Sequence, residues 1–272
     1  MITTEIMGGL GNQLFQIFNL ISYCLTNKKP FYFEIADVVR EDRPFYWNVF
    51  LKSLKPFLKP KINIPICRET SFEYNALPNY NSSFKFFGYF QSYRYFIENQ
   101  ENIYKIIKLN DNLNIVRKKY DYDYSNTLSL HFRIGDYKHI QHHHPIMNKY
   151  YYVDAIQHII DKTNIDTWNI LYFYEEMDKS IVNETINYLK GKFNKINFIS
   201  IHTDIVDYEQ LLLMSNCEHN IIANSSFSWW GAYFNKNKNK IITYPSLWFG
   251  PAQSSNTKDL FPNTWNKINV IN

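Results

Sequence analysis

An arginine and a histidine stand at the end of an apolar stretch in the middle of the chain, where they are candidates for binding an anion. In residues 127–133 apolar side chains alternate with polar ones, which is the period of a β-strand and places His131 and Arg133 on one face. A guanidinium at a strand end, followed by the turn at Gly135, is suited to gripping a phosphate with paired N–H groups. Arg133 can equally pair with a nearby carboxylate such as that of Asp136, so residue types alone leave both interpretations open.

A second candidate anion site lies in residues 224–231, where a predicted strand leads into a predicted helix. The hydroxyls of Ser225 and Ser226 stand beside the free backbone N–H groups of the opening helical turn, an arrangement that binds anions. A serine that only caps a helix contributes about 1 kcal/mol of stability. Such a cap needs one serine, whereas this stretch holds three, together with the consecutive Trp229 and Trp230.

Two further polar stretches follow predicted strands. The carboxylates of Glu175 and Glu176 can accept hydrogen bonds from ribose hydroxyls or purine N–H groups, or they can complement the dipole of the next helix. Residues 8–13, Gly-Gly-Leu-Gly-Asn-Gln, join a strand to a helix but match neither the dinucleotide-binding spacing nor a P-loop.

Four histidines, at positions 139, 142, 143 and 144, gather in a polar stretch after Arg133. Imidazoles at such spacing can hold a transition metal. Because no strand or helix is predicted there to fix their geometry, we interpret His139–His144 as a solvated loop instead.

The elements that position these residues are clearest after residue 126. Predicted strands at 128–133, 169–174, 196–201, 220–223 and 240–244 alternate with helices near 150–161, 178–190, 207–216 and 226–234. This alternation predicts right-handed βαβ units and a parallel sheet, which binds ligands beyond the carboxyl ends of its strands. Earlier in the chain we expect strands at 2–7 and 31–35 and a helix with Leu14, Phe18, Ile21 and Leu25 on one face, while residues 40–125 are too irregular to assign.

Composition limits the class of protein. The 272 residues carry a net charge of +4, with 45% hydrophobic and 20% charged residues, which is typical of one or two globular domains and excludes wholesale disorder. The basic residues are spread out, so the sequence does not favour nucleic-acid binding. Three cysteines without metal spacing favour a reducing compartment, and residues 14–25 are too short and polar to cross a membrane. We therefore expect a soluble, cytoplasmic protein without a signal peptide or transmembrane segment.

Taken together, three ordered motifs resemble the alpha-1,2-fucosyltransferases of glycosyltransferase family 11, in their short bacterial or viral form. They are residues 8–16, 131–137 and 221–232, supported by residues 88–91, 94–96, 150–152 and 248–250. The resemblance implies a GT-B-type α/β fold, with two Rossmann-like domains whose parallel sheets face a central cleft. Residues 1–125 would form the acceptor-side domain and residues 126–272 the GDP-fucose-binding domain.

The resemblance also implies roles for individual residues. Arg133 would grip the GDP pyrophosphate, Ser225 or Ser226 would bind a phosphate, and Glu175 would contact the ribose or guanine, although many members have Ser-Asp-Asp at residues 174–176. Asn12 corresponds to an important asparagine of the related protein O-fucosyltransferases. We assign catalysis to Arg133, His131, Asp136 and Asn12. The expected donor-binding residues are Gly9, Gly11, Asn12, Arg133, Glu175, Ser225, Ser226 and Phe227.

The implied reaction is an inverting transfer of L-fucose from GDP-β-L-fucose to a glycan hydroxyl, at the 2-position of a terminal galactose. No metal cofactor is expected, so Arg133, His131 and the helix starting near Ser226 must supply positive charge and N–H donors to the departing pyrophosphate. Candidates for the general base are Asp136, Glu5, Glu34 and Asp37. The alternatives are a transferase of the same fold that uses another nucleotide sugar, and a non-catalytic module that binds glycans or nucleic acid through its aromatic residues.

Overall fold

The computed structural model describes residues 1–36, 43–253 and 255–270. The chain forms two compact units, which we call unit 1 (Met1–Asn112 with Ser255–Pro262) and unit 2 (Leu113–Ser254 with Asn263–Asn272). The chain therefore returns to unit 1 near its end, whereas the sequence predicts a single boundary between residues 125 and 126. The acceptor-side and donor-side roles of the two parts stay predictions.

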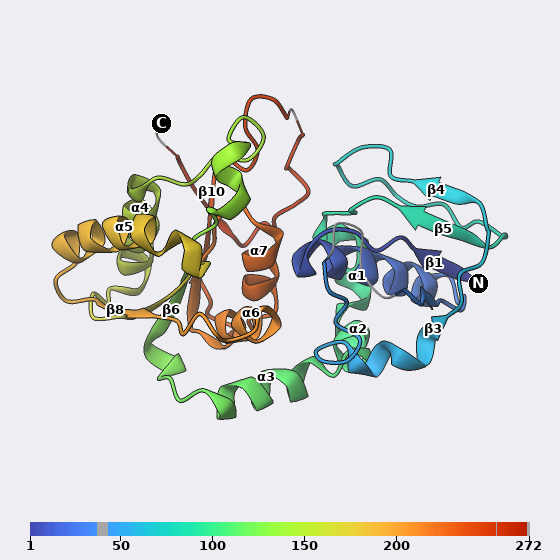
Figure 1. Ribbon diagram of the computed structural model, residues 1–272, viewed down its shortest axis with the longest axis horizontal. Coiled ribbons are helices and arrows are strands. Elements are labelled where there is room, and N and C mark those ends of the chain that lie inside the picture. The colour runs from blue at the N-terminus through green and yellow to red at the C-terminus, as the bar shows by residue number, and fades with distance from the viewer. Residues whose placement is uncertain (37–42, 254, 271–272) are drawn as a thin grey trace. The chain divides into compact units, whose positions relative to one another are not determined.

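Unit 1 is built on short parallel strands. A three-stranded sheet has the order β1-β5-β4, and a separate parallel pair joins β2 to β3. These strands are β1 (Ile2–Thr4), β2 (Phe33–Glu34), β3 (Leu58–Lys59), β4 (Ile66–Arg68) and β5 (Phe84–Phe87). The helices are α1 (Leu10–Thr26), α2 (Gln100–Ile106) and α3 (Leu109–Lys119), and α3 carries the chain into unit 2 (Figure 1).

Helix α1 is the centre of the unit 1 core. The predicted apolar stripe is buried at Leu14, Phe18 and Ile21, while Leu25, in the last turn, is 36% exposed. The ring of Phe18 meets that of Phe96 edge to face, with centroids 5.3 Å apart. Aromatic burial of this kind explains how strands of two to four residues can hold a stable unit.

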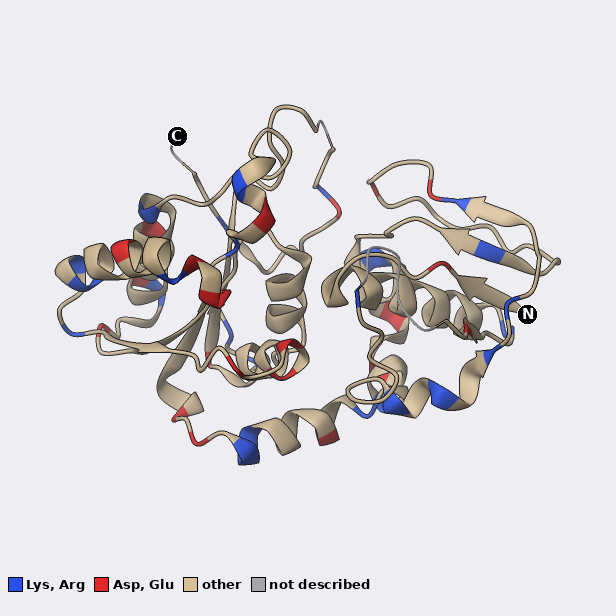
Figure 2. Ribbon diagram, in the orientation of Figure 1, with Lys and Arg blue, Asp and Glu red and all other residues tan. Residues whose placement is uncertain are grey.

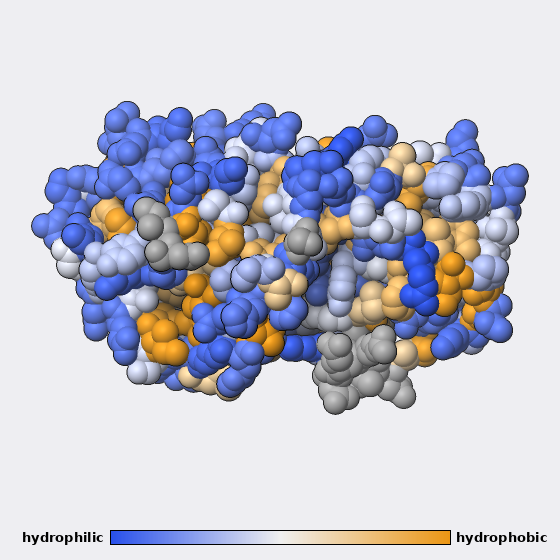
Figure 3. Space-filling model, turned by 90° about the horizontal axis from the view of Figure 1, so that it is seen from above, coloured by the Kyte–Doolittle hydropathy of each residue, from blue (hydrophilic) through white to orange (hydrophobic). Residues whose placement is uncertain are grey.

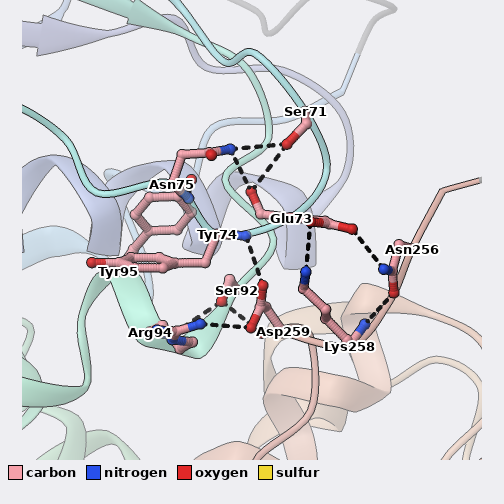
Figure 4. Close-up of polar contacts among 10 residues, drawn as sticks. All are labelled: Ser71, Glu73, Tyr74, Asn75, Ser92, Arg94, Tyr95, Asn256, Lys258 and Asp259. Atoms are coloured by element: carbon pink, nitrogen blue, oxygen red, sulfur yellow. Dashed lines mark hydrogen bonds and ion pairs between the residues drawn. The ribbon is translucent and has the colours of Figure 1, made fainter.

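The returning segment, residues 255–262, is bound to unit 1 by a cluster of polar contacts (Figure 4). The Asp259 carboxylate pairs with the Arg94 guanidinium at 2.8 Å and accepts a hydrogen bond from the Tyr74 backbone N–H at 3.1 Å. The Ser92 hydroxyl donates to the Asp259 carbonyl at 2.6 Å, and Lys258 pairs with Glu73 at 2.7 Å. A segment distant in sequence thus completes unit 1.

Unit 2 has the parallel sheet that the sequence predicts, and its six strands have the order β11-β10-β9-β6-β7-β8. Their bounds are β6 (Thr127–His131), β7 (Asn169–Phe173), β8 (Asn197–Ser200), β9 (His219–Ile221), β10 (Ile242–Pro245) and β11 (Asn266–Ile268). The helices are α4 (Lys149–Thr163), α5 (Lys179–Lys192), α6 (Asp207–Asn216) and α7 (Ser226–Tyr233). Only β11, a strand of three residues, is absent from the prediction for this part.

The two faces of the unit 2 sheet are covered by different helices, α4 and α5 on one and α6 and α7 on the other (Figure 1). The alternation in β6 follows this division. Leu128 and Leu130 pack into the core beneath α4 and α5, while Ser129 accepts a hydrogen bond from the buried amide of Asn220 at 2.7 Å. Charged residues lie mainly on the helices and loops around the sheet (Figure 2).

The surface of the chain is mixed in polarity. On the face drawn in Figure 3, apolar residues form separate small patches between hydrophilic ones. Within the described residues, no helix combines the length and the hydropathy needed to cross a bilayer.

Candidate active site

The strand order of unit 2 reverses between β6 and β9, and a parallel sheet is best suited to bind a ligand at such a switch point. Strand β6 is the first strand of the sheet in sequence; the next two strands lie on one side of it, and β9 and its successors lie on the other. The connections from β6 and β9 therefore leave toward opposite faces, and open parallel sheets bind ligands beyond the carboxyl ends of their strands at such a point. His131 ends β6, and Asn224–Phe227 follow β9, so two of the predicted anion-binding stretches meet at this switch point.

Arg133 lies just beyond β6, and its guanidinium is held by two carboxylates. It pairs with Asp136 on its own loop and with Glu175, which follows β7. The arginine side chain is 22% exposed, whereas those of Asp136 and Glu175 are 56% and 50% exposed. Pairing with carboxylates, one of the two interpretations of this sequence, is thus what the structure shows. Because both partners reach solvent, an anion can compete with them for the guanidinium.

The turn after Arg133 is held by Asp178, an aspartate that the sequence analysis did not identify. The backbone N–H of Gly135 donates to Asp178 at 2.7 Å, and Lys138 pairs with the same buried carboxylate at 2.6 Å. Gly135 has φ of +29°, and a Cβ there would lie 2.9 Å from a Glu175 oxygen. Asp178 carried no signal in the sequence because it resembles any acid at the start of a helix.

His131 is buried beside Arg133, and its imidazole is neutral. Burial, with a smaller contribution from the positive charge of Arg133, lowers the pKa of His131 to about 3. Its Nδ1 has no hydrogen-bond partner among the residues that the structure describes, and its ring lies 5.6 Å from that of Phe227. At neutral pH, His131 can therefore offer the departing pyrophosphate an N–H group or a lone pair, and its catalytic role stays a prediction.

Helix α7 begins at this site with a side-chain cap. Ser225 is the N-cap, and its hydroxyl accepts a hydrogen bond from the Phe227 N–H at 3.3 Å. Ser226 is the first residue of the helix. The two tryptophans that follow are completely buried, with ring centroids 5.0 Å apart, so they belong to the core. The arrangement leaves the opening turn of α7 at the switch point as a source of N–H groups and partial positive charge.

The histidine stretch is more ordered than a solvated loop. His139, His142 and His143 are exposed, but the ring of His144 stacks on that of Tyr137, with centroids 4.8 Å apart and planes 20° apart. The described part of the chain contains no group of three or more His, Cys, Asp or Glu residues placed to hold a metal. Sequence inspection missed this order because Tyr137 and His144 are seven residues apart and lie in successive turns, and no periodic pattern connects them.

The glycine loop and Asn12 belong to unit 1, so they are described apart from Arg133 and Ser225. Gly9 is the N-cap of α1, and Gly11 and Asn12 lie in its first turn. Asn12 accepts a hydrogen bond from Gln91 at 2.9 Å, which links two of the motifs found in the sequence. Gly8 has φ of +72°, and a Cβ there would lie 2.7 Å from the Asn12 amide, so this close approach requires glycine.

The glutamines of the same motif hold this loop in place. Gln13 donates to the carbonyls of Gly8 and Pro44, both at 3.0 Å, and Gln16 accepts from the Met7 N–H at 2.9 Å. Both glutamine side chains are buried. Much of this motif therefore serves the local fold of unit 1.

The candidate bases differ in their surroundings. Glu5 and Glu34 both pair with the buried Lys85, at 3.2 and 2.8 Å. Burial opposes the charge of Lys85, but hydrogen bonds to Glu34 and Glu5 raise its pKa overall. Asp136 pairs with Arg133 in unit 2, and Asp37 lies outside the described residues. Of the described candidates, Glu5 and Glu34 belong to unit 1, and Asp136 belongs to unit 2, where it follows β6.

Comparisons with known proteins agree with this architecture. An alpha-1,2-colitosyltransferase of Escherichia coli is 27% identical over 98% of both chains. A galactoside 2-alpha-L-fucosyltransferase of Caenorhabditis elegans is 25% identical over 99% of this chain and 79% of its own length.

Two solved structures share the fold. The ADP-heptose lipopolysaccharide heptosyltransferase II of E. coli superimposes with a TM-score of 0.54 and 10% identity, over 99% of this chain and 90% of its own. FUT1 of Arabidopsis thaliana, solved as a variant in complex with GDP, gives a TM-score of 0.51 and 8% identity, over 89% of this chain and 69% of its own. The GT-B-type α/β fold with parallel sheets is therefore confirmed. Residues 33–269 match glycosyl transferase family 11, and the chain belongs to that family.

Proposed function

We propose that this glycosyltransferase moves L-fucose from GDP-β-L-fucose to the 2-hydroxyl of a terminal galactose, with inversion and without a metal. The observation that supports it best is the meeting of Arg133 and the opening turn of α7 at the switch point of the unit 2 sheet. A guanidinium and helix N–H groups at one edge suit a diphosphate leaving group. The name of the C. elegans relative supports the galactose acceptor and the linkage.

In the proposed reaction the acceptor oxygen attacks the anomeric carbon of fucose on the face opposite GDP. The bond from that carbon to the β-phosphate oxygen breaks, GDP departs with the bonding electrons, and the β donor linkage becomes an α product. Arg133 and the α7 N–H groups stabilise the charge that develops on GDP. Asp136 is our candidate for accepting the proton of the acceptor hydroxyl, which requires that it release Arg133.

A second donor sugar deserves a direct test because the E. coli relative is a colitosyltransferase. Colitose is fucose without its 3-hydroxyl, so the two donors present the same diphosphate and differ at one sugar position. A site that hydrogen-bonds the 3-hydroxyl should reject the analogue that lacks it, because its polar partners would be left unpaired.

The decisive experiment incubates the purified chain with GDP-fucose, GDP-colitose, GDP-mannose or UDP-galactose and a panel of galactose-terminated glycans, in parallel reactions that contain either EDTA or added Mn²⁺ or Zn²⁺. The proposal expects transfer from GDP-fucose and a product that NMR identifies as α-1,2-linked. Transfer from GDP-colitose alone would reassign the donor. A strict requirement for Mn²⁺ or Zn²⁺ would contradict the metal-independent mechanism.

Arg133→Ala tests the site within the same assay. Losing one preorganised contact to the leaving group lowers the transfer rate by roughly 100-fold or more. Arg117→Ala is the matched control: Arg133 and Arg117 both lie over tyrosine rings of unit 2, at 4.9 Å from the centroid of Tyr137 and 5.3 Å from that of Tyr124, but Arg117 is on α3. Equal activities of the two variants would contradict the assignment of Arg133.

A further inference from the structure

Arg133, Tyr137 and His144 form a continuous stack beside the proposed donor site. The Arg133 guanidinium carbon lies 4.9 Å from the centroid of the Tyr137 ring. The next ring in the stack is His144, whose centroid is 4.8 Å from that of Tyr137, with the planes only 20° apart. The ring of Phe249 follows at 5.6 Å from His144. The Tyr137 ring thus contacts both the imidazole of His144 and the guanidinium of Arg133.

The tyrosine is also held at its hydroxyl end. Tyr137 donates to the backbone carbonyl of Asn224 at 3.0 Å. The buried side-chain amide of Asn224 donates in turn to the carbonyls of Pro145, at 2.9 Å, and Trp248, at 3.1 Å. Asn224 therefore joins the loop before α7 to the histidine stretch and to the stretch at residues 248–250.

The histidine stretch itself is fixed by its backbone. The N–H of Gly250 donates to the carbonyl of His143 at 2.8 Å, and the N–H of Ala252 donates to that of His142 at 2.9 Å. A Cβ on Gly250 would lie 2.3 Å from the His142 carbonyl oxygen, so this approach requires glycine. His144 is consequently presented to Tyr137 by an ordered loop.

We propose that His144 and Tyr137 are positioning residues that hold the Arg133 guanidinium ready for a diphosphate, so that the histidine stretch serves Arg133 and not a metal. The identity of the ligand rests on the proposed function. Arginine loses considerable side-chain freedom when it is fixed in one geometry, and an arginine already ordered on a ring binds an anion at a smaller entropic cost.

The first arm of the test measures GDP binding by titration calorimetry at pH 8. His144→Ala removes the ring that supports Tyr137, and we expect roughly 3- to 10-fold weaker binding, the range of a partly desolvated cation–π contact. His144→Phe keeps a ring and should bind GDP within about twofold of the unmodified protein. His142→Ala is the matched control: its side chain is exposed on the same stretch, and its backbone contact survives the change.

Two calorimetric results would overturn the proposal. One is wild-type affinity in His144→Ala. The other is a loss in His144→Phe as large as in His144→Ala, which would mean that the imidazole nitrogens matter and the stacking does not.

The second arm of the test is measured without GDP. Its result therefore does not depend on whether the proposed function is correct. In the free protein with labelled arginine, the ring of Tyr137 should shift the Arg133 side-chain NMR signals upfield. We expect that shift to shrink in His144→Ala, to persist in His144→Phe and His142→Ala, and to vanish in Tyr137→Leu. If the unmodified protein binds no GDP, the donor assignment fails and this arm decides the positioning role alone. An Arg133 spectrum unchanged in Tyr137→Leu and His144→Ala overturns it.

Discussion

Acidification should destabilise unit 2 through His131. This imidazole is buried at the end of β6, and the neighbouring charged group that acts on it is the Arg133 guanidinium. Burial first, and that positive charge second, lower the pKa of His131 from about 6.5 to about 3. The folded chain therefore keeps His131 neutral at pH values where the unfolded chain takes up a proton.

The size of the effect follows from linkage. Because the unfolded state binds more protons between pH 6.5 and 3, the free energy of unfolding falls as the pH is lowered through that window, and the full stability is present above it. With the two pKa values above, lowering the pH from 7.5 to 5 removes about 2 kcal/mol through this one group. His144 and His219 also have lowered pKa values, chiefly from burial, so the total loss is larger and His131 must be isolated by substitution.

Urea unfolding at pH 7.5 and pH 5.0 isolates that contribution. His131→Gln retains a polar side chain but cannot titrate, so its loss of stability between the two pH values should be smaller than that of the unmodified protein by about 2 kcal/mol. His142→Gln makes the same replacement at an exposed histidine of unit 2 and is the matched control for the substitution itself. If His131→Gln and the unmodified protein lose stability equally, His131 is not a buried neutral imidazole and the description of the site is wrong.

Three further changes test the supports of the two units. Gly250→Ala places a Cβ against the His142 carbonyl oxygen and should lower the free energy of unfolding by roughly 1–3 kcal/mol. An unchanged urea midpoint would show that the loop has room for this Cβ. Ser225→Ala removes the cap of α7 and should cost about 1 kcal/mol in the same measurement while weakening GDP binding, and unaltered values for both would remove Ser225 from the site. Asp259→Asn breaks the ion pair with the half-exposed Arg94 and should cost up to about 1 kcal/mol and speed proteolysis within residues 255–262, whereas wild-type resistance would mean that other contacts hold this segment.

The sheet of unit 2 was predictable because its strand segments, with apolar side chains that are continuous or alternate with polar ones, recur between helical stretches. His131 ends β6, Glu175 and Ser225 follow β7 and β9, and parallel strands bring their carboxyl ends to one edge. Strand β11 escaped because only one of its three residues, Ile268, is apolar, whereas the equally short β9 leads into the apolar run at residues 221–223. In unit 1 the predicted strands at 2–7 and 31–35 contain β1 and β2, whereas β3, β4 and β5 lie in the stretch that was too irregular to assign; β3 has only two residues and pairs with a strand distant in sequence.

The candidate site was predictable in its parts but not in its connections. A guanidinium, an acid after the next strand and a serine cap could each be named from the chain. That Glu175 pairs with Arg133, 42 residues away, depends on the order of the strands in the sheet. The stack of Tyr137 and His144 depends on a loop path set by Gly250, and an exposed histidine and a packed one look alike in sequence. Local sequence patterns therefore do not determine which loops of the site contact each other.

The balance of charge around Arg133 explains why its positioning matters for the proposed donor. One guanidinium faces the carboxylates of Asp136 and Glu175, and His131 adds no charge, so these groups together do not attract an anion from a distance. A diphosphate must displace exposed carboxylates, which are free to turn toward water at small cost. It then gains a guanidinium whose orientation the Tyr137 ring already determines, together with the N–H groups of α7. The proposed site therefore selects a diphosphate through the fixed orientation of the Arg133 guanidinium. A flexible arginine beside the same two carboxylates would remain paired with Asp136 and Glu175.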